Sequence, residues 1–214
     1  EGETFVAFVD LSGFKELMNQ ENKAWKALDA FYNIGYSSLL VTQVGNEPIK
    51  VEGLFISDCG VLFVRNGNNT DKLKALLGVI TNLNKKMLEK DFMLTSSICY
   101  GPFKYQERIE FKGIEKNLLL GNAYVSAYLD SEKTKPQIQP GQCRIVASNL
   151  PDDIVHSIET GSVPIFKKII KENTTHYYFY WSVRDNNEIE NFKREYRNAY
   201  NLKFAGMIKA LKGD

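Results

Sequence analysis

The sequence predicts an α+β fold: a βαββαβ core, the ferredoxin-like or split βαβ arrangement, extended by a C-terminal strand pair and helix. An apolar, β-rich run covers Thr4 to Val9. Two further strand-like runs, Ile49 to Ile56 and Gly60 to Val64, are close enough to form a hairpin. The residues from Asp71 to Lys90 then repeat apolar side chains at helical spacing.

The N-terminal elements follow each other with clear breaks. The first strand stops at Asp10, and Leu11-Ser12-Gly13 separates it from a helical stretch that runs from Phe14 to about Leu40. A polar segment, Asn19 to Lys23, interrupts this stretch, so we expect a long or broken helix. Thr70-Asp71 offers an N-cap for the next helix.

The second half of the chain predicts one more core strand and a C-terminal extension. We expect one domain over 1–214, with a core of about 4–147 and an extension of about 148–214. The expected elements are a strand Phe92 to Tyr100 closed by Gly101-Pro102, a helix Leu118 to Asp130, an exposed linker Lys133 to Gln142, a strand Cys143 to Ala147, a helix Pro151 to Ile158, strands Val163 to Ile170 and His176 to Trp181, and a closing helix Asn187 to Leu211.

The composition limits the classes of function. The formal net charge of +1 gives no electrostatic argument for nucleic acid. Cys59, Cys99 and Cys143 are odd in number and widely spaced, which favours a reducing compartment, and we expect a cytoplasmic protein. His156 and His176 show no zinc-ligand spacing, and no apolar run approaches the roughly 20 residues of a membrane span.

Asp10 and Asp58 are the candidate metal ligands and catalytic residues. Each follows an apolar strand, where an unpaired carboxylate costs several kcal/mol. The first strand and the hairpin are neighbours in the predicted sheet, so the two side chains are expected to meet at one edge. A divalent cation would offset their repulsion, and two Mg²⁺ or Mn²⁺ ions there would hold a nucleoside triphosphate. A turn-forming or capping role for each aspartate is the alternative.

The residues after Asp10 are candidates for binding phosphate. The backbone amides of Leu11, Ser12, Gly13 and Phe14 are expected to form the first turn of a helix, where N–H groups and the helix dipole favour anions. Gly13 permits close approach of the ligand.

At these residues the chain resembles the class III nucleotidyl cyclases, whose first strand and hairpin carry two metal-binding aspartates. The matching segments are AFVDLSGF (Ala7 to Phe14), FISDCGVLF (Phe55 to Phe63), LTSSICYGPF (Leu94 to Phe103) and LLLGNAYVSAYLDSE (Leu118 to Glu132). The VD-L-GF opening, the SD hairpin and the G-x-A helix with its Ala-Tyr pair are most similar to the pyrimidine cyclases of Pycsar antiphage systems. This resemblance implies a palm-type cyclase fold, a homodimer, and conversion of UTP or CTP to the 3′,5′-cyclic monophosphate and pyrophosphate, a second messenger in antiphage defence.

The cation that stabilises the transition state has several candidates. Where purine cyclases carry an Asn and an Arg on the helix after the glycine, this sequence has Val125 and Leu129. Lys50, at an even offset from Asp58, is the catalytic candidate, and Arg108 or Lys112 is the alternative. The candidates for stacking the base are Tyr100, Phe103 and Phe14, and the aromatic stripe Tyr177 to Trp181 would suit a subunit interface if it is partly exposed; Glu52 is expected to pair with Lys50.

Two other functions remain open. A catalytically silent cyclase-like module would bind nucleotide without turnover, which the absent Arg favours. A palm-type oligonucleotide synthase would share the paired carboxylates, but such enzymes usually carry two adjacent acidic residues at the hairpin, whereas Cys59 follows Asp58 here.

Overall fold

The computed structural model describes residues 2–39, 42–44, 47–111, 114–202 and 204–214. Its strands are β1 (Gly2–Leu11), β2 (Thr42–Val44), β3 (Glu47–Ile49), β4 (Val51–Ile56), β5 (Cys59–Val64), β6 (Leu94–Phe111), β7 (Ile114–Leu120), β8 (Cys143–Val146), β9 (Ile169–Lys171) and β10 (His176–Phe179). Its helices are α1 (Phe14–Leu17), α2 (Glu21–Ser38), α3 (Asn69–Glu89), α4 (Asn122–Lys133), α5 (Asp152–Thr160), α6 (Ile189–Tyr200) and α7 (Phe204–Lys212), with short 3₁₀ turns η1 (Pro164–Lys168) and η2 (Asn186–Glu188).

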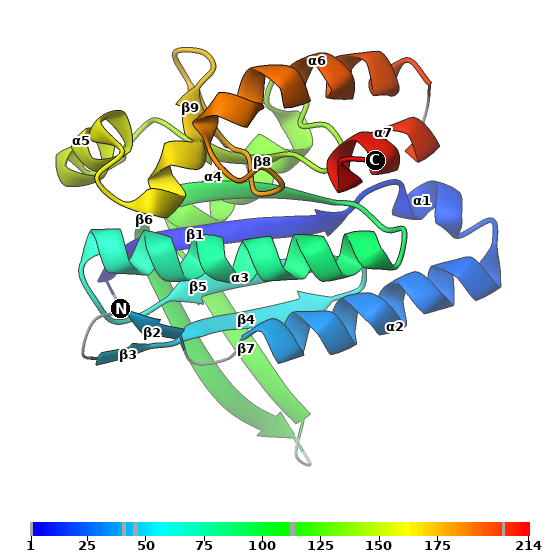
Figure 1. Cartoon of the computed structure of the whole chain (residues 1–214). Coiled ribbons are helices and arrows are strands. Elements are labelled where there is room, and N and C mark those ends of the chain that lie inside the picture. The colour runs from blue at the N-terminus through cyan, green and yellow to red at the C-terminus, as the bar shows by residue number, and fades with distance from the viewer. Residues whose placement is uncertain (1, 40–41, 45–46, 112–113, 203) are drawn as a thin grey trace.

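The main sheet confirms the predicted βαββαβ core. Its order is β4-β5-β1-β6-β8-β10-β9, and the first four strands pair antiparallel. Strand β8 then adds parallel to β6, and β10 and β9 extend the sheet antiparallel. Beyond the sheet, β6 continues with β7 as a two-stranded arm that projects from the body of the molecule (Figure 1). The central position of β1, between β5 and β6, holds the end of this strand in place.

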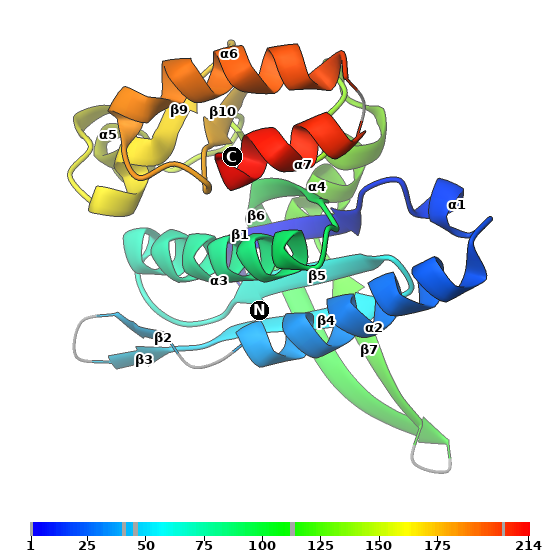
Figure 2. The ribbon, with the colours of Figure 1, turned by 45° about the vertical axis from the view of Figure 1, so that its right-hand side comes forward.

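Alternation along β1 divides its side chains between two layers. Phe5, Ala7, Val9 and Leu11 lie in the larger core with α2 and α3, whereas Val6 and Phe8 lie on the opposite face with α4. Figure 2 shows α2 and α3 on one face of the sheet and α4 on the other. Burying a leucine of α3 stabilises the fold by roughly 1.5–3 kcal/mol. Six fully or nearly fully buried apolar residues of α3 are Leu73, Leu76, Leu77, Ile80, Leu83 and Met87.

The predicted helix boundaries need two corrections near the core. Helix α3 begins at Asn69 and is capped by Asn68, whose side chain accepts from the Asp71 N–H, so Thr70-Asp71 is not the cap. Residues 118–120 belong to β7, and α4 begins only at Asn122. Between them Gly121 has φ 141°, and a Cβ there would meet the Pro102 carbonyl, so the chain turns at this glycine.

Strand β6 runs past Gly101-Pro102, where we expected it to close. Glu3 and Pro102 are paired across β1 and β6, while pairing with β8 ends at Ile98 and pairing with β7 begins at Lys104. Pro102 therefore lies where β6 has only one neighbouring strand, and a proline is tolerated there.

The C-terminal layer differs from the prediction in two ways. The closing helix is split into η2, α6 and α7, and the first of the two predicted strands is mostly η1, followed by the short β9. The aromatic stripe is core: Tyr177, Tyr178, Phe179 and Trp181 are at most 8% exposed. Because these side chains are buried within the chain, they cannot form the subunit interface for which the sequence suggested them.

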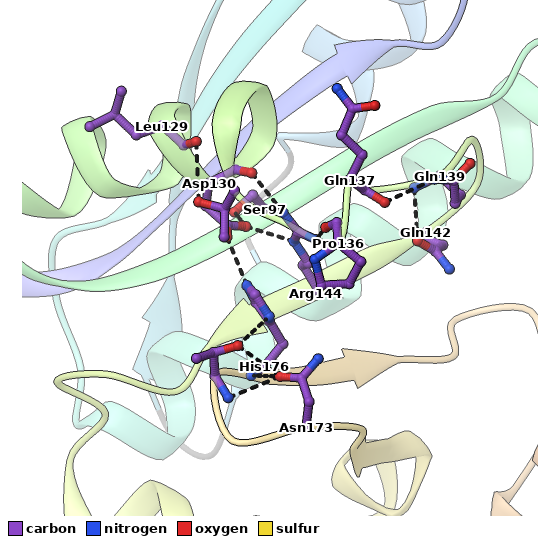
Figure 3. Close-up of polar contacts among 12 residues, drawn as sticks. Ser97, Leu129, Asp130, Pro136, Gln137, Gln139, Gln142, Arg144, Asn173 and His176 are labelled. Atoms are coloured by element: carbon purple, nitrogen blue, oxygen red, sulfur yellow. Dashed lines mark hydrogen bonds and ion pairs between the residues drawn. The ribbon is translucent and has the colours of Figure 1, made fainter.

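A buried ionic cluster fastens this layer to α4. The carboxylate of Asp130 accepts from Ser97 Oγ (2.5 Å) and Arg144 Nε (2.7 Å), and its other oxygen lies 2.8 Å from His176 Nε2. The remaining nitrogens of Arg144 donate to the carbonyls of Asp130 and Pro136, both at 2.6 Å (Figure 3). The cluster thus joins α4, β6, β8 and β10 through charges that are fully matched.

None of the described helices is long and apolar enough to cross a membrane.

Candidate functional site

Asp10 lies near the end of the central strand. It pairs with Cys59 on β5 and with Thr95 on β6, and the alternation of β1 directs it to the same face as Phe8 and Val6. Its side chain is half-buried. The position is therefore at an edge of the sheet where a carboxylate remains accessible to a ligand.

Asp58 reaches the same edge through a tight hairpin. Ile56 pairs with Cys59, so Ser57 and Asp58 form a two-residue turn, and Ser57 adopts φ 55° as its first central residue. The carbonyl of Asp58 accepts the N–H of Leu11 at 2.9 Å, which fixes the tip of the hairpin beside the end of β1. The structure thus brings Asp10 and Asp58 together.

The charges at this edge are not matched. Burial, the negative charge of Asp58 and then that of Glu132 together raise the pKa of Asp10 to about 7. The same three causes, burial first, raise the pKa of Cys59, with Asp10 adding to them. Within the described part of the chain, no lysine, arginine or histidine forms an ion pair with Asp10 or Asp58. A bound cation would offset both the desolvation cost of the charged Asp10 carboxylate and its repulsion by the neighbouring carboxylates.

Glu132 is a site residue that the sequence interpretation missed. It lies in the last turn of α4, exposed to solvent, and its charge acts on both Asp10 and Cys59. One signal could have found it: Glu132 is four residues after Tyr128, and these positions share a helix face. The Tyr128 ring packs edge-on against Phe8 at 5.4 Å, two residues before Asp10.

Of the four backbone amides predicted to bind phosphate after Asp10, two are already used in hydrogen bonds within the fold. The N–H of Leu11 donates to Asp58 and that of Ser12 to the Met93 carbonyl (2.9 Å), so neither is free for a ligand. The amides of Gly13 and Phe14 have no partner among the described residues. The Ser12 hydroxyl is also buried without a hydrogen-bond partner there. Helix α1 has four residues, so its dipole adds little.

Within one chain the structure does not bring Lys50 to this edge, where a catalytic lysine was expected from the sequence. It precedes β4, and the six residues of that strand separate it from the turn that carries Asp58. At about 3.3 Å per residue, this separation is about 20 Å. Glu52 pairs with Arg65 at 2.8 Å and not with Lys50. Of the alternatives, the side chain of Arg108 and all of Lys112 lie outside the described residues.

Two of the three aromatic candidates pack far from the aspartates. Tyr100 lies opposite Phe5, with ring centroids 4.8 Å apart, and its hydroxyl donates to Asn69 at 3.2 Å. Phe103 is buried against Phe63, also at 4.8 Å. Both therefore belong to the opposite end of β1. Phe14 alone remains next to the candidate site, directly after Gly13.

The donor set fits a hard divalent cation that also takes oxygens from its substrate. No group of three or more His, Cys, Asp or Glu that could hold a metal ion by itself occurs in the described ranges. Two carboxylates at one edge, where burial and then mutual repulsion raise the pKa of Asp10, match the way Mg²⁺ is held by one or two carboxylates plus phosphate oxygens.

No protein-family model matches the sequence, and no curated protein is similar to it in sequence. Solved structures do match. The adenylyl cyclase CyaB from P. aeruginosa superposes with a TM-score of 0.53 and 15% identity, over 83% of this chain and 92% of that chain. A bacterial light-regulated adenylyl cyclase gives a TM-score of 0.51 and 12% identity, over 83% of this chain and 51% of that chain. The chain therefore has the palm-type fold of the class III nucleotidyl cyclases.

Proposed function

We propose that this protein is a cytoplasmic, metal-dependent nucleotidyl cyclase that converts a nucleoside triphosphate to its 3′,5′-cyclic monophosphate and pyrophosphate. The observation that carries the proposal is the meeting of Asp10 and Asp58 at one sheet edge, where the Asp10 pKa is raised to about 7. A site with two unmatched carboxylates on a cyclase fold supports chemistry on a triphosphate.

The residues of the chain have separate roles in this proposal. Asp10 and Asp58 hold two Mg²⁺ or Mn²⁺ ions, and the free amides of Gly13 and Phe14 hold a phosphate oxygen. When bound, the ions neutralise charge on the triphosphate and lower the pKa of the ribose 3′-hydroxyl. The exposed Glu132 adds negative charge at the same edge, which favours occupancy by cations.

The proposed substrate is a pyrimidine triphosphate, UTP before CTP. This choice is supported by the sequence motifs around Asp10, Asp58 and the Ala127-Tyr128 pair, which resemble the Pycsar pyrimidine cyclases. By the same resemblance the cyclic product is a second messenger in antiphage defence.

A homodimer is part of the proposal because α4 leaves an apolar face uncovered. Val125, Tyr128 and Leu129 are 47%, 41% and 39% exposed and lie at i, i+3 and i+4 on that helix. Leu118 and Leu120 on β7 are exposed as well. A second copy that packs on these side chains would bury them and complete the site with its own residues.

The activity assay uses all four triphosphates. The protein is incubated with each triphosphate and Mn²⁺, and the products are separated by chromatography. We expect cyclic UMP as the main product, and its loss in Asp10→Ala and Asp58→Ala at unchanged or higher melting temperature. If no triphosphate gives a cyclic nucleotide or pyrophosphate, the enzyme proposal is wrong.

A silent cyclase-like module is the second candidate. It is favoured by the apolar Val125 and Leu129 on the exposed face of α4, where purine cyclases carry Asn and Arg. This candidate predicts Mn²⁺-dependent binding of UTP without product. The oligonucleotide synthase is separated by product size, since it would release chains longer than one nucleotide.

A further inference from the structure

A cavity of about 460 Å³ lies in the C-terminal layer, between β10, α6 and the segment after α4. Its volume is within the roughly 300–1,000 Å³ range of small-molecule sites. Two strands, β6 and β8, separate β10 from β1, and neither Asp10 nor Asp58 lines the cavity. It is therefore distinct from the candidate active site.

One wall of the cavity is aromatic. The Phe192 and Tyr196 rings lie 5.7 Å apart at 31°, and Tyr180 meets Phe192 edge-on at 6.0 Å. Tyr196 is held by a hydrogen bond from its hydroxyl to the Pro140 carbonyl. Fixed rings of this kind offer a flat face on which a planar heterocycle can stack.

The cations on the same helix differ in what neutralises them. Lys193 lies 2.7 Å from Glu172 and 3.0 Å from Glu190, so its charge is matched. Arg197 is one turn further along α6, lines the cavity, and has no hydrogen bond or ion pair with any described residue. Its exposed guanidinium is available for an anionic group of a ligand.

Two amide groups in the cavity lining have unused donors. The Gln142 side-chain oxygen accepts the Gln139 N–H at 2.8 Å, and the Asn173 side-chain oxygen accepts the His176 N–H at 2.8 Å. These bonds assign the oxygens, so each NH₂ is identified, and neither has a partner in the described part of the chain. Side-chain N–H donors suit the carbonyl oxygens of a keto-bearing ring.

We propose that this cavity binds a nucleoside monophosphate, with the base stacked on Phe192 and Tyr196 and the phosphate at Arg197. The base stacks on the aromatic wall, and its carbonyl oxygens accept hydrogen bonds from the side-chain amides of Gln142 and Asn173. The guanidinium of Arg197 pairs with the phosphate. The site requires no metal. It also does not depend on the proposed cyclase activity.

Calorimetric titration tests the site in the full chain carrying Asp10→Asn and Asp58→Asn, in EDTA, so that nucleotide binding at the active site is removed. The probes are 5′-UMP and 3′,5′-cyclic UMP, which distinguish an open from a cyclic phosphate. Uridine lacks the phosphate and ribose 5-phosphate lacks the ring. We expect at least one of the two nucleotides to bind with a Kd below about 1 mM. Each fragment should bind at least about tenfold more weakly.

Arg197→Gln and Arg194→Gln form the matched pair of variants in the same background. Both arginines are exposed on α6, but Arg194 does not line the cavity and donates to Asn191. Arg197→Gln should weaken nucleotide binding at least about tenfold, and Arg194→Gln should leave it within about twofold. The proposal is overturned if neither nucleotide binds, if uridine or ribose 5-phosphate binds as tightly as the nucleotides, or if the two variants bind equally.

Discussion

Asp130 and Asp10 are carboxylates in largely apolar surroundings, and they differ in what meets their charge. Asp130 is 4% exposed and is contacted by Ser97, Arg144 and His176. Asp10 is less buried, yet it faces two further carboxylates, and no cation of the described chain pairs with it. The charge of Asp130 is paired within the fold by Arg144, whereas the charge of Asp10 has no partner there and is available to a ligand.

This difference separates a structural carboxylate from a functional one. Burial alone does not identify a site, since the more deeply buried aspartate belongs to the framework. A carboxylate whose pKa is raised by burial and by like charges destabilises the folded state unless something binds there. Variants that remove one charge at a time should therefore act in opposite directions in the two regions.

The largest effect is expected for Arg144→Leu. It leaves the Asp130 carboxylate buried without its cation, and should lower the free energy of unfolding by about 3–5 kcal/mol, measured by urea denaturation. Arg65→Leu is the control, because the side chains of Arg65 and Glu52 are 48% and 20% exposed, and their partly exposed ion pair should contribute less than about 1 kcal/mol. Equal losses in the two variants would remove the distinction between the matched cluster and the surface.

The next effect is a gain in stability for Asp10→Asn at alkaline pH. Folding raises the Asp10 pKa from 3.8 to about 7, so the unfolded chain releases this proton first as the pH rises. The free energy of unfolding of the wild type should therefore fall as the pH rises from 3.8 to about 7, and it should not recover at higher pH. Allowing for solvent screening around a half-buried group, the loss is about 2 kcal/mol.

Urea denaturation of wild type and Asp10→Asn at pH 4, 6 and 8 without divalent ions measures this difference. The two proteins should be similar at pH 4, and the variant should be more stable at pH 8. A wild type that gains stability relative to the variant between pH 4 and 7 would contradict the assignment of an unmatched charge.

A smaller effect concerns which neighbour raises the pKa of Asp10. Asp58 contributes more than Glu132, so Asp58→Asn should lower the Asp10 pKa more than Glu132→Gln. Carboxyl ¹³C NMR titration of Asp10 measures both shifts. If the pKa of Asp10 is unchanged in Glu132→Gln, Glu132 and its helix α4 are not part of the site.

The smallest effect is expected at the hairpin turn that carries Asp58. Ser57 has φ 55°, which a glycine adopts without strain, but glycine also loses more backbone entropy on folding. Ser57→Gly should change the free energy of unfolding by less than about 1 kcal/mol, and Ser57→Pro by more, since proline cannot adopt this φ. A large effect of glycine would show that the serine side chain, and not the turn, positions Asp58.

The βαββαβ core could be predicted because local pattern and pairing agree there. The apolar run before Asp10, the hairpin around Asp58 and the helix of α3 each signal their element within a short window. Residues 118–120 could not be assigned correctly, because the arm of β6 and β7 is defined by its cross-strand pairing, which overrides helical spacing. The break at Gly101-Pro102 was overridden in the same way by pairing with β1.

The candidate site was predicted in its carboxylates but not in its surroundings. Asp10 and Asp58 are placed by short-range rules, the end of a strand and the tip of a hairpin. The amides of Leu11 and Ser12 donate to the carbonyls of Asp58 and Met93, so they are not free for phosphate. These partners are distant in sequence, and no local pattern predicts them. Lys50 satisfied a parity rule for the predicted strand, but it lies just before β4, at the end of that strand away from Asp58. Glu132 reaches the site because α4 packs against β1; its i, i+4 spacing from Tyr128 gives the helix face that it shares, but not the strand that this face meets.

Cation binding tests most directly whether the edge at Asp10 and Asp58 is a functional site. Mn²⁺ is titrated calorimetrically at pH 8, with a non-hydrolysable UTP analogue present, into wild type and into the Asp10→Asn/Asp58→Asn double variant. We predict that the wild type binds Mn²⁺ with the analogue and that its melting temperature rises, while the double variant shows neither change. Equal Mn²⁺ binding by both proteins, or none by either, would contradict the account.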